Sequence, residues 1–597
     1  MNDRVARGPG GAASGESVFT RFDSGLVSRM WAFIRPHRWT VFVALGCIGL
    51  FTLVQISIPL ALRYAIDSAV GEVPVPLEVV LGAFMLLVLA YAVFQFLSEW
   101  LATRVAQWVI FDLRRAMFIH LHRVPLGVLD RTQVGRLMAR LQGDVGALQE
   151  FLENSLSALG DLFLLLGIVV VLLALDLRLG VLTLSTLPLL ILARALWIPW
   201  AKRQYLRARE ASSSVNAALA ENINGVRTVQ ENRREDFNFA RYRERADENL
   251  RAQIGSARAS QIMVPAVDLL TGVALAVVVV AGGISLLAGS IGIGVVVAYI
   301  FFVQRFFDPI RTLSMQYTQM QRAAAAAQRV FEVLDLPLTL VEKVGAPDLV
   351  ADEPSIEFRH VGFAYRPGQP VLHDIDLHIA ANRTVAIVGP TGSGKTSLVG
   401  LVQRFYDPSE GEVLIAGQNL REVSLASLGR NIGMVLQEPF LFSGSILENI
   451  RYGRREASVE EVIAAARTVH AHDFIVALPD GYDTLLGQRG RNLSVGQRQL
   501  LSFARALLAD PRILILDEAT ANIDSHTELA IQEAMKILLR GRTSLVIAHR
   551  LTTVRHADLI VVMQRGRIAE MGSHEQLVAR GGLYGALYLS SLNPFDD

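Results

Sequence analysis

Lysine is nearly absent from this sequence of 597 residues. Only Lys202, Lys343, Lys395 and Lys536 are present, and arginine supplies the remaining cationic side chains. The chain also has a single cysteine, Cys47, which lies in an apolar run, so no disulfide can form within the chain. The formal net charge is +1, which gives no overall basic field and therefore predicts no nucleic-acid partner.

The N-terminus lacks the apolar core and cleavage site of a signal peptide. Residues 1–28 are instead rich in Gly, Ser and Arg. Such a segment buries too little apolar surface to offset the entropy of ordering, so we expect residues 1–28 to be disordered.

Apolar residues are abundant, at 52% of the chain, and are concentrated in its first half. A helix that crosses a hydrocarbon core of about 30 Å needs roughly 20 apolar residues. Pro188 and Pro265 each lie within a candidate run and can bend or interrupt its helix. The six runs of suitable length are Trp39–Leu62, Leu77–Phe96, Leu156–Leu175, Leu179–Trp197, Ile262–Leu287 and Ile291–Phe307.

The connections between these runs differ in length and charge. Those after the second and fourth runs are long, polar and rich in arginine, whereas the one after the third offers only Arg178. Because cytoplasmic loops carry the excess of positive charge, we expect both long loops and both termini to lie in the cytoplasm. This predicts a multi-pass protein of the cytoplasmic membrane. We interpret the long loops, which contain few Gly or Pro, as helical extensions of the membrane helices.

The second half of the chain has a different pattern. An alanine-rich helical stretch, Ala323–Ala327, leads to a proline-containing linker, and strands and helices alternate from Ser355 onward. Short apolar runs such as Val385–Val388 and Ile513–Leu516 are typical of buried parallel strands. The predicted parts are a membrane domain over 29–320, a linker over 321–354 and a soluble α/β domain over 355–597.

One of the four lysines stands in a glycine-rich run between a strand and a helix. Backbone N–H groups of such a loop bind phosphates, and the helix N-terminus adds its dipole. The compact ammonium of Lys395 fits between β- and γ-phosphates better than a guanidinium does. The hydroxyl of Thr396, the next residue, can bind Mg²⁺. The run matches the phosphate-binding pattern G-x-x-x-x-G-K-[ST], and we include the serine after it: Gly389, Pro390, Thr391, Gly392, Ser393, Gly394, Lys395, Thr396 and Ser397.

In the α/β domain, the short apolar run Ile513–Leu516 is followed directly by two acidic residues, Asp517 and Glu518. A buried strand of this kind delivers Asp517 to the metal, and Glu518 can polarise the attacking water. Two acids can also simply end a strand. With a phosphate-binding loop upstream, the sequence favours the catalytic interpretation and predicts hydrolysis of a bound nucleoside triphosphate.

Between these two motifs lies a serine- and glutamine-containing segment, Leu493-Ser494-Val495-Gly496-Gln497-Arg498-Gln499. At this point the chain resembles an ABC transporter of the exporter type, a half-transporter with the membrane domain first. The resemblance extends from about Val27 over nearly all of the chain. It implies a six-helix transmembrane domain plus an α/β P-loop ATPase domain. It also implies ATP-driven export, or leaflet flipping, of an amphipathic or lipid-like substrate by alternating access of a dimer.

The resemblance implies roles for individual residues around ATP and Mg²⁺. Tyr365 matches the aromatic residue that stacks on adenine. Gln437 matches the glutamine that touches Mg²⁺ and links the site to the membrane domain, and His549 matches the histidine at the γ-phosphate. Asp524 matches a loop that crosses the dimer interface. Three residues match the signature loop that closes on ATP bound by the other subunit: Ser494, Gly496 and Gln497.

Two positions depart from the family's usual pattern. Val495 stands where the signature has glycine, and Gln488 follows Gly487 where glutamate is common. Such departures occur in exporters that pair two different subunits. Because Glu518 and His549 are kept, this chain's own phosphate loop can form a competent site. A heterodimer and a homodimer that tolerates valine therefore both remain open.

Two turns in the long loops resemble the segments through which exporters couple their domains, Asp130–Arg136 and Glu221–Val229. We expect Gly135 and Gly225 to permit tight backbone turns there. Each turn can equally be an ordinary connection between helices.

The charged and aromatic residues near the membrane runs do not identify the transported substrate. Asp161, Arg194 and Asp268 are costly in a membrane and either serve transport or lie in cytoplasmic helix extensions. The aromatic run from Tyr299 to Phe307 either lines a cavity for an amphipathic substrate or forms a packed or lipid-facing belt.

Other functions compete with export. A few exporter-like proteins import siderophores or similar small molecules, and this is our alternative. An ABC ATPase acting on nucleic acid or ribosomes is disfavoured by the six apolar runs and the lack of a basic field. An ATP-gated channel is disfavoured because Glu518 indicates turnover. The expected partners are a second half-transporter, membrane lipid and a small amphipathic substrate.

Overall fold

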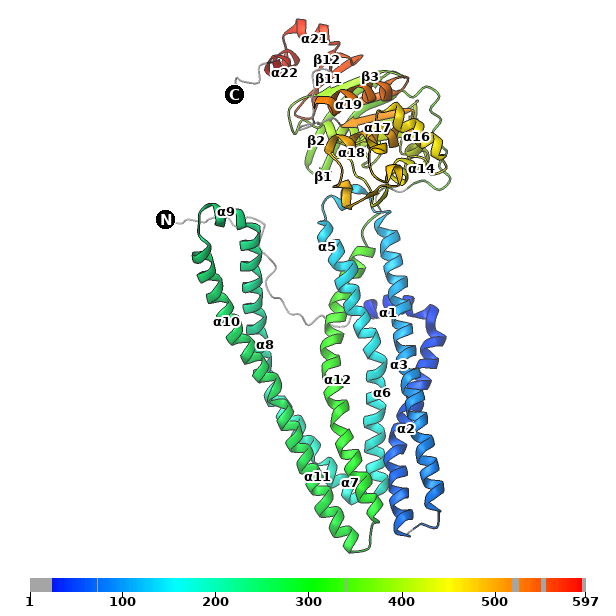
Figure 1. Cartoon of the computed structure of the whole chain (residues 1–597), viewed down its shortest axis with the longest axis vertical. Helices are drawn as coiled ribbons and strands as arrows, with labels where there is room; N and C mark the ends of the chain where they lie inside the picture. The colour runs from blue at the N-terminus through cyan, green and yellow to red at the C-terminus, as the bar shows by residue number, and fades with distance from the viewer. Residues whose placement is uncertain are drawn as a thin grey trace. The chain divides into compact units, whose positions relative to one another are not determined.

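A computed structural model of the chain describes residues 24–71, 73–338, 340, 342–517, 525–548 and 554–592. The chain divides into two compact units (Figure 1). The membrane unit comprises Met1–Leu121 and Gly135–Asp335, and the nucleotide unit comprises His122–Val134 and Leu336–Asp597. A short piece of the first long loop therefore belongs with the nucleotide unit.

The membrane unit consists of long helices joined by short turns (Figure 1). The first helix begins at Ser24, inside the segment 1–28 that we expected to be disordered, while residues 1–23 lie outside the described residues. The helices are α1 (Ser24–Ile34), η1 (Arg35–His37), α2 (Arg38–Val70), α3 (Leu77–Leu121), α5 (Val134–Ala139), η2 (Arg140–Asp144), α6 (Val145–Leu175), α7 (Leu177–Leu184), α8 (Thr186–Asn224), α9 (Val226–Glu231), α10 (Glu235–Gln261), α11 (Met263–Leu287) and α12 (Ile293–Leu334).

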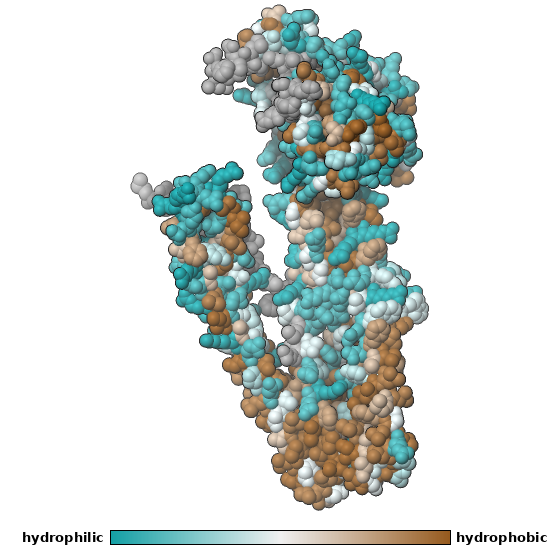
Figure 2. Space-filling model, in the orientation of Figure 1, coloured by the Kyte–Doolittle hydropathy of each residue, from teal (hydrophilic) through white to brown (hydrophobic). Residues whose placement is uncertain are grey.

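Six helical stretches among the described residues are long and apolar enough to cross a membrane. This confirms the six predicted spans. Figure 2 shows apolar side chains gathered over the part of the helices that carries the short connections α2–α3, α6–α7 and α11–α12. The stretches are Gly25–Val70, Leu77–Leu121, Val134–Leu175, Leu177–Asn224, Glu235–Leu287 and Ile293–Ile310.

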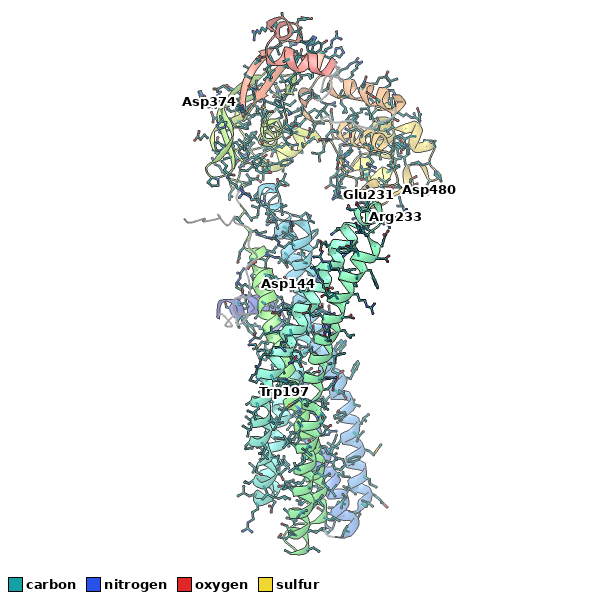
Figure 3. The ribbon with its side chains drawn as sticks, turned by 90° about the vertical axis from the view of Figure 1, so that its left-hand side faces the viewer. Asp144, Trp197, Glu231, Arg233, Asp374 and Asp480 are labelled. Atoms are coloured by element: carbon teal, nitrogen blue, oxygen red, sulfur yellow. The ribbon has the colours of Figure 1, made fainter. Side chains whose placement is uncertain are left out.

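The long loops are helical extensions, as the sequence indicated. Helix α3 continues without a break to Leu121, and α8 lies beside α10 (Figure 1). The indole N–H of Trp197 joins these two helices by donating to the carbonyl of Ala259 at 2.8 Å (Figure 3). Helices α8 and α11 each begin two residues before their proline, Pro188 or Pro265, because a proline in the first turn needs no N–H donor.

Most of the aromatic run of α12 packs inside the membrane unit, whereas Phe301 is 40% exposed. Tyr299, Phe302, Phe306 and Phe307 are at most 5% exposed and belong to one core with α6, α7 and α11. The Tyr299 hydroxyl donates to the carbonyls of Leu172 and Asp176. Of the two interpretations that the sequence left open, the structure therefore favours a packed belt over a cavity lining.

The charged residues noted in the membrane runs all lie within the helical stretches that can span a membrane. Asp161 of α6 lies beside Thr312 and Asp308 of α12. Arg194 is on α8, and Asp268 is on α11. Their roles in transport stay predictions.

The nucleotide unit contains a six-stranded sheet, ordered β12-β11-β3-β10-β9-β6, and a four-stranded antiparallel sheet, ordered β2-β1-β4-β5. Five strands of the larger sheet are parallel, and only the edge strand β12 is antiparallel. The strands are β1 (Ile356–Arg366), β2 (Gln369–Ile379), β3 (Thr384–Val388), β4 (Glu410–Ile415), β5 (Gln418–Asn419), β6 (Ile432–Val435), β7 (Gly444–Ser445), β8 (Leu485–Leu486), β9 (Ile513–Asp517), β10 (Thr543–Ile547), β11 (Leu559–Gln564) and β12 (Arg567–Gly572).

The larger sheet separates two apolar cores. Alternate residues of a strand point to opposite faces. Accordingly, Val385 and Ile387 of β3 belong to one core, and Ala386 and Val388 belong to the other. The helices of this unit are α4 (Leu126–Leu129), α13 (Lys395–Val402), α14 (Leu425–Asn431), α15 (Ile446–Arg451), α16 (Val459–Thr468), α17 (His472–Val476), η3 (Gly481–Asp483), η4 (Gln488–Gly490), α18 (Val495–Ala509), α19 (Ser525–Leu539), α21 (His574–Arg580) and α22 (Leu583–Leu592).

Six apolar spans followed by this α/β unit confirm the predicted fold class.

Candidate nucleotide-binding site

The predicted site lies at the carboxyl edge of the parallel strands. Strand β10 sits between β3 and β9, and Ile547 is aligned with Ile387 on one side and with Asp517 on the other. Strand β6 follows β9, with Val435 aligned with Leu516. Because parallel strands end at the same edge, the phosphate loop after β3, Asp517 and the segment after β6 meet there, where open α/β sheets bind ligands.

Two glycines let the phosphate loop turn tightly against its neighbours. Gly389 has φ +149°, and a Cβ there would overlap the carbonyl oxygen of Met563. Gly394 has φ +103°, and a Cβ there would lie 2.7 Å from Cδ2 of Leu372. Both conformations are available to glycine and strained for other residues. The loop therefore needs glycine at these two positions because of its backbone, independently of any bound phosphate.

Lys395 begins α13 and folds back over the loop. Its Nζ donates to the carbonyls of Gly389 at 2.8 Å and Pro390 at 3.1 Å, and the residue is only 8% exposed. Burial lowers the pKa of the Lys395 ammonium, and the nearby carboxylate of Asp517 acts in the opposite direction. Neutral carbonyls compensate a buried cation poorly, so the ammonium gains much by meeting an anion.

The loop also offers hydroxyl groups. The Oγ of Ser393 is buried and has no hydrogen-bond partner in the described part of the chain. Thr396 is exposed on the first turn of α13, beside exposed Thr391 and Gly392. The hydroxyl of Ser393 and the buried ammonium of Lys395, both at one helix N-terminus, fit the oxygens of a polyphosphate. The exposed hydroxyl of Thr396 is the kind of oxygen ligand that Mg²⁺ prefers.

Tyr365 of β1 stands beside this helix. Its hydroxyl is 2.9 Å from the Oγ of Ser397, and 36% of the residue is exposed. Its ring packs edge-on against Phe363, with centroids 4.8 Å apart, and against Tyr406, with centroids 5.1 Å apart. The structure thus brings the aromatic residue that we matched to adenine stacking together with the phosphate loop.

Gln437 lies two residues beyond the end of β6 and is exposed. Asp517 ends β9 and is half-buried. Both therefore reach the same edge as the phosphate loop. Glu518, Asp524 and His549 lie outside the described residues, so their predicted roles rest on the sequence.

The signature segment lies at the start of a separate helix, α18. Ser494 caps this helix: its Oγ accepts from the N–H of Gln497 at 3.2 Å, and its own N–H donates to Oε1 of Gln497 at 3.0 Å. Gly496 is buried, and Val495 is 43% exposed in ordinary helical backbone. The fold of this chain thus needs no glycine at 495. The described residues show no hydrogen bond between this segment and the phosphate loop.

The first predicted coupling turn, Asp130–Arg136, overlaps the piece of the long loop that belongs with the nucleotide unit. That piece, His122–Val134, shares residues 130–134 with the prediction and also includes α4, which lies just before it. Gly135 lies within helix α5, so the tight turn that we expected there is not formed, whereas Gly225 lies at the turn between α8 and α9. Sequence reasoning also missed Tyr406, whose hydroxyl donates to Oδ2 of Asp130. The available signal was the aromatic pair Phe405-Tyr406 directly before Asp407-Pro408.

Two family models match the chain. The ABC transporter transmembrane region matches residues 41–310, and the ABC transporter model matches residues 372–521. A solved structure of a bacterial Atm1-family ABC exporter with ATP bound is similar, with a TM-score of 0.74 and 30% identity, covering 93% of this chain and 98% of that one.

Curated relatives match over most of their length. An ABC transporter ATP-binding protein of Bacillus subtilis (strain 168) is 37% identical over 582 residues, 96% of each chain. The ATP-dependent lipid A-core flippase of Syntrophus aciditrophicus (strain SB) is 35% identical, covering 94% of each chain. A fatty acid ABC transporter ATP-binding/permease protein of Mycobacterium bovis is 38% identical, covering 85% of this chain and 80% of that one. The chain therefore belongs to the ABC transporter family, as an exporter-type half-transporter that couples ATP hydrolysis to transport.

Proposed function

We propose that this half-transporter exports an amphipathic or lipid-like molecule, or flips it between leaflets, by alternating access of a dimer. The observation that carries this proposal is the similarity over nearly the whole chain to relatives named for fatty acids, for lipid A-core and for multidrug export. Six apolar spans support it, because the helices of two such subunits can enclose a pathway for a molecule that is apolar over most of its length.

In the proposed site, the loop 389–394 and Lys395 bind the phosphates of ATP and Tyr365 stacks on adenine. The Oγ of Ser393 then gains the partner that it lacks. Thr396, Gln437 and Asp517 fit Mg²⁺, because a threonine hydroxyl, an amide and a carboxylate converge on the carboxyl edge of β3, β6 and β9. Such an ion neutralises charge on the phosphate oxygens. We assign Glu518 to orienting water and His549 to the γ-phosphate.

The half-transporter organisation implies a dimer, and we propose that its two ATP sites are shared. Ser494, Gly496 and Gln497 then close on ATP bound by the partner, and Asp524 crosses the interface. Val495 presents a branched side chain on that surface, where the family's usual signature has a bare backbone. We propose that both termini lie in the cytoplasm, because the arginine-rich extensions belong on that side.

Alternating access requires that ATP bind the closed dimer more tightly than the open one, because only differential affinity shifts a population. We propose that α4 and the turn at Glu221–Val229 carry this shift into the membrane helices.

Substrate-stimulated ATP hydrolysis in nanodiscs tests the proposed cargo. The panel contains fatty acids, phospholipids of differing head group, amphipathic drugs and, as controls, hydrophilic solutes of similar size. We expect stimulation by amphipathic members only. A flat response across the panel would contradict the proposed substrate class. Accumulation of a stimulating compound inside inside-out vesicles then establishes export, whereas its ATP-dependent loss from preloaded vesicles of that orientation would indicate import.

A further inference from the structure

Within the nucleotide unit, Tyr406 connects two sites that are far apart in the sequence. Its segment follows α13 and is held firmly, since the buried Arg404 is only 4% exposed and its Nε donates to Asp407 at 3.2 Å. Gly400 of α13 lies against the ring as well, because a Cβ there would be 3.5 Å from Cδ2 of Tyr406. The ring of Tyr406 therefore has a fixed position beside the helix that begins with Lys395.

One side of the Tyr406 ring faces the adenine side of the nucleotide site. Its ring centroid lies 5.1 Å from that of Tyr365 at an interplanar angle of 90°, and 5.4 Å from that of Phe363. Tyr365 in turn shares a hydrogen bond of 2.9 Å with Ser397. Edge-to-face aromatic pairs are directional, so a ring stacked on Tyr365 would restrict the ring packed against its edge.

The opposite contact of Tyr406 is with the first cytoplasmic loop. The hydroxyl donates to Oδ2 of Asp130, which ends α4. The backbone of Gly127 lies so close that a Cβ would come within 2.8 Å of Cε1 of Tyr406. Burial, followed by the bond to the Asp130 carboxylate, raises the pKa of the Tyr406 phenol, so the hydroxyl remains a proton donor across the physiological range.

We propose that Tyr406 is the positioning residue through which occupancy of the adenine side by ATP fixes the α4 segment of the first cytoplasmic loop. The proposal rests on the proposed nucleotide site and names the route by which that site acts on the loop. Adenine stacked on Tyr365 holds the ring of Tyr406, and Tyr406 holds α4 through Asp130 and Gly127. Because the chain leads from α4 to α3 on one side and to α5 on the other, the contact carries ATP binding toward transport.

The test measures amide hydrogen exchange of residues 122–134 in the full-length protein, with and without the non-hydrolysable analogue AMP-PNP. In the wild type we expect the nucleotide to slow exchange in this segment. In Tyr406→Phe and Asp130→Asn we expect the slowing to fall by about tenfold, the factor that loss of one hydrogen bond to a charged group produces. The double variant should lose no more than either single variant, because both remove the same bond.

Matched controls separate this role from general destabilisation. Tyr482→Phe removes another half-buried tyrosine hydroxyl of this unit, which is 2.9 Å from Nδ1 of His472, and should keep the full nucleotide effect. Gly127→Ala changes no hydrogen-bonding side chain but forces α4 away from the ring, and should reproduce the loss. AMP-PNP affinity of Tyr406→Phe should stay within about tenfold of the wild type, since the lost hydrogen bond to the Asp130 carboxylate lies outside the bound molecule.

Two outcomes would overturn the proposal. If AMP-PNP slows amide exchange of residues 122–134 as much in Tyr406→Phe as in the wild type, α4 responds to the nucleotide by another route. Slowing that is absent from the wild type despite measured AMP-PNP binding would show that α4 does not respond at all, and it would leave the proposed nucleotide site intact. Failure of the proposed site is recognised separately, because wild-type protein would then bind no AMP-PNP.

Discussion

At the scale of single residues, the buried charge of Lys395 is poorly compensated by its neighbours, and a bound polyphosphate would compensate it better. Among the described residues, its buried ammonium donates hydrogen bonds to two neutral carbonyls of the loop, and the Asp517 carboxylate lies nearby. We expect Lys395→Ala to weaken ATP binding by about 10- to 100-fold, the value of one hydrogen bond between charged groups. Titration calorimetry in detergent measures this. Lys536→Ala removes an exposed lysine of α19 and should leave the affinity unchanged, and equal affinities for wild type and Lys395→Ala would refute the assignment.

Gly389 illustrates a residue that serves the fold and the site together. Its φ of +149° and the adjacent carbonyl of Met563 leave no room for a Cβ. Gly389→Ala should therefore lower the free energy of unfolding of the nucleotide unit by at least about 2 kcal/mol. Denaturant unfolding followed by intrinsic fluorescence reports the change. Gly429→Ala, on helix α14 with open space around it, should be neutral or slightly stabilising, and similar losses in both would contradict this explanation.

Glu518 carries the predicted chemistry of hydrolysis. Removing its charge while keeping its shape, in Glu518→Gln, should lower the rate of ATP hydrolysis by about 10²- to 10⁴-fold and leave ATP binding intact. Phosphate release in nanodiscs measures the rate, and nucleotide affinity is measured in parallel. A rate near that of the wild type would remove Glu518 from the proposed catalytic site.

At the scale of helices, Asp67 of α2 holds the start of α12. Its carboxylate is 4% exposed, accepts the N–H of Gly294 at 2.9 Å and lies 3.4 Å from Nε of Arg63. Gly294 permits this approach, because a Cβ there would overlap the carboxylate. Glycine at position 294 is thus explained by its contact with Asp67, a residue 227 positions away in the sequence.

We therefore expect Asp67→Ala to destabilise the membrane unit by about 1–3 kcal/mol, because it leaves a buried N–H without an acceptor. Asp67→Asn keeps an acceptor oxygen and should lose less. Thermal unfolding of the full chain in detergent compares both with Asp247→Ala, which removes an exposed carboxylate of α10. Equal unfolding temperatures for Asp67→Ala and Asp247→Ala would contradict a structural role for Asp67.

At the scale of the whole molecule, shared ATP sites require two half-transporters in one particle. Native mass measurement in detergent should give about twice the 65.4 kDa of one chain for a dimer of identical copies. If the partner is a different half-transporter, peptide sequencing of the particle will show a second chain of the same organisation. A single chain that hydrolyses ATP at the full rate would contradict sites closed by the signature segment of a partner.

Much of this architecture could be read from the sequence because its signals are local. Apolar runs of membrane length gave the six spans, and the spacing from Gly389 to Thr396 gave the phosphate loop with its strand and helix. The predicted coupling turn did not include α4, because this helix has only four residues and no periodicity to mark it. Tyr406 was missed because a tyrosine before an Asp-Pro turn looks like an ordinary surface residue until its contacts are known.

The sequence by itself therefore determined the order of domains, the phosphate loop and Asp517 at the end of β9, because each depends on residues adjacent along the chain. Only the tertiary structure decided that most of the aromatic run of α12 is packed, that Gly294 makes room for Asp67, and that Tyr406 lies between Tyr365 and Asp130. Those facts depend on pairs of residues brought together by burial. Burial depends on the whole chain, and no spacing in the sequence encodes it.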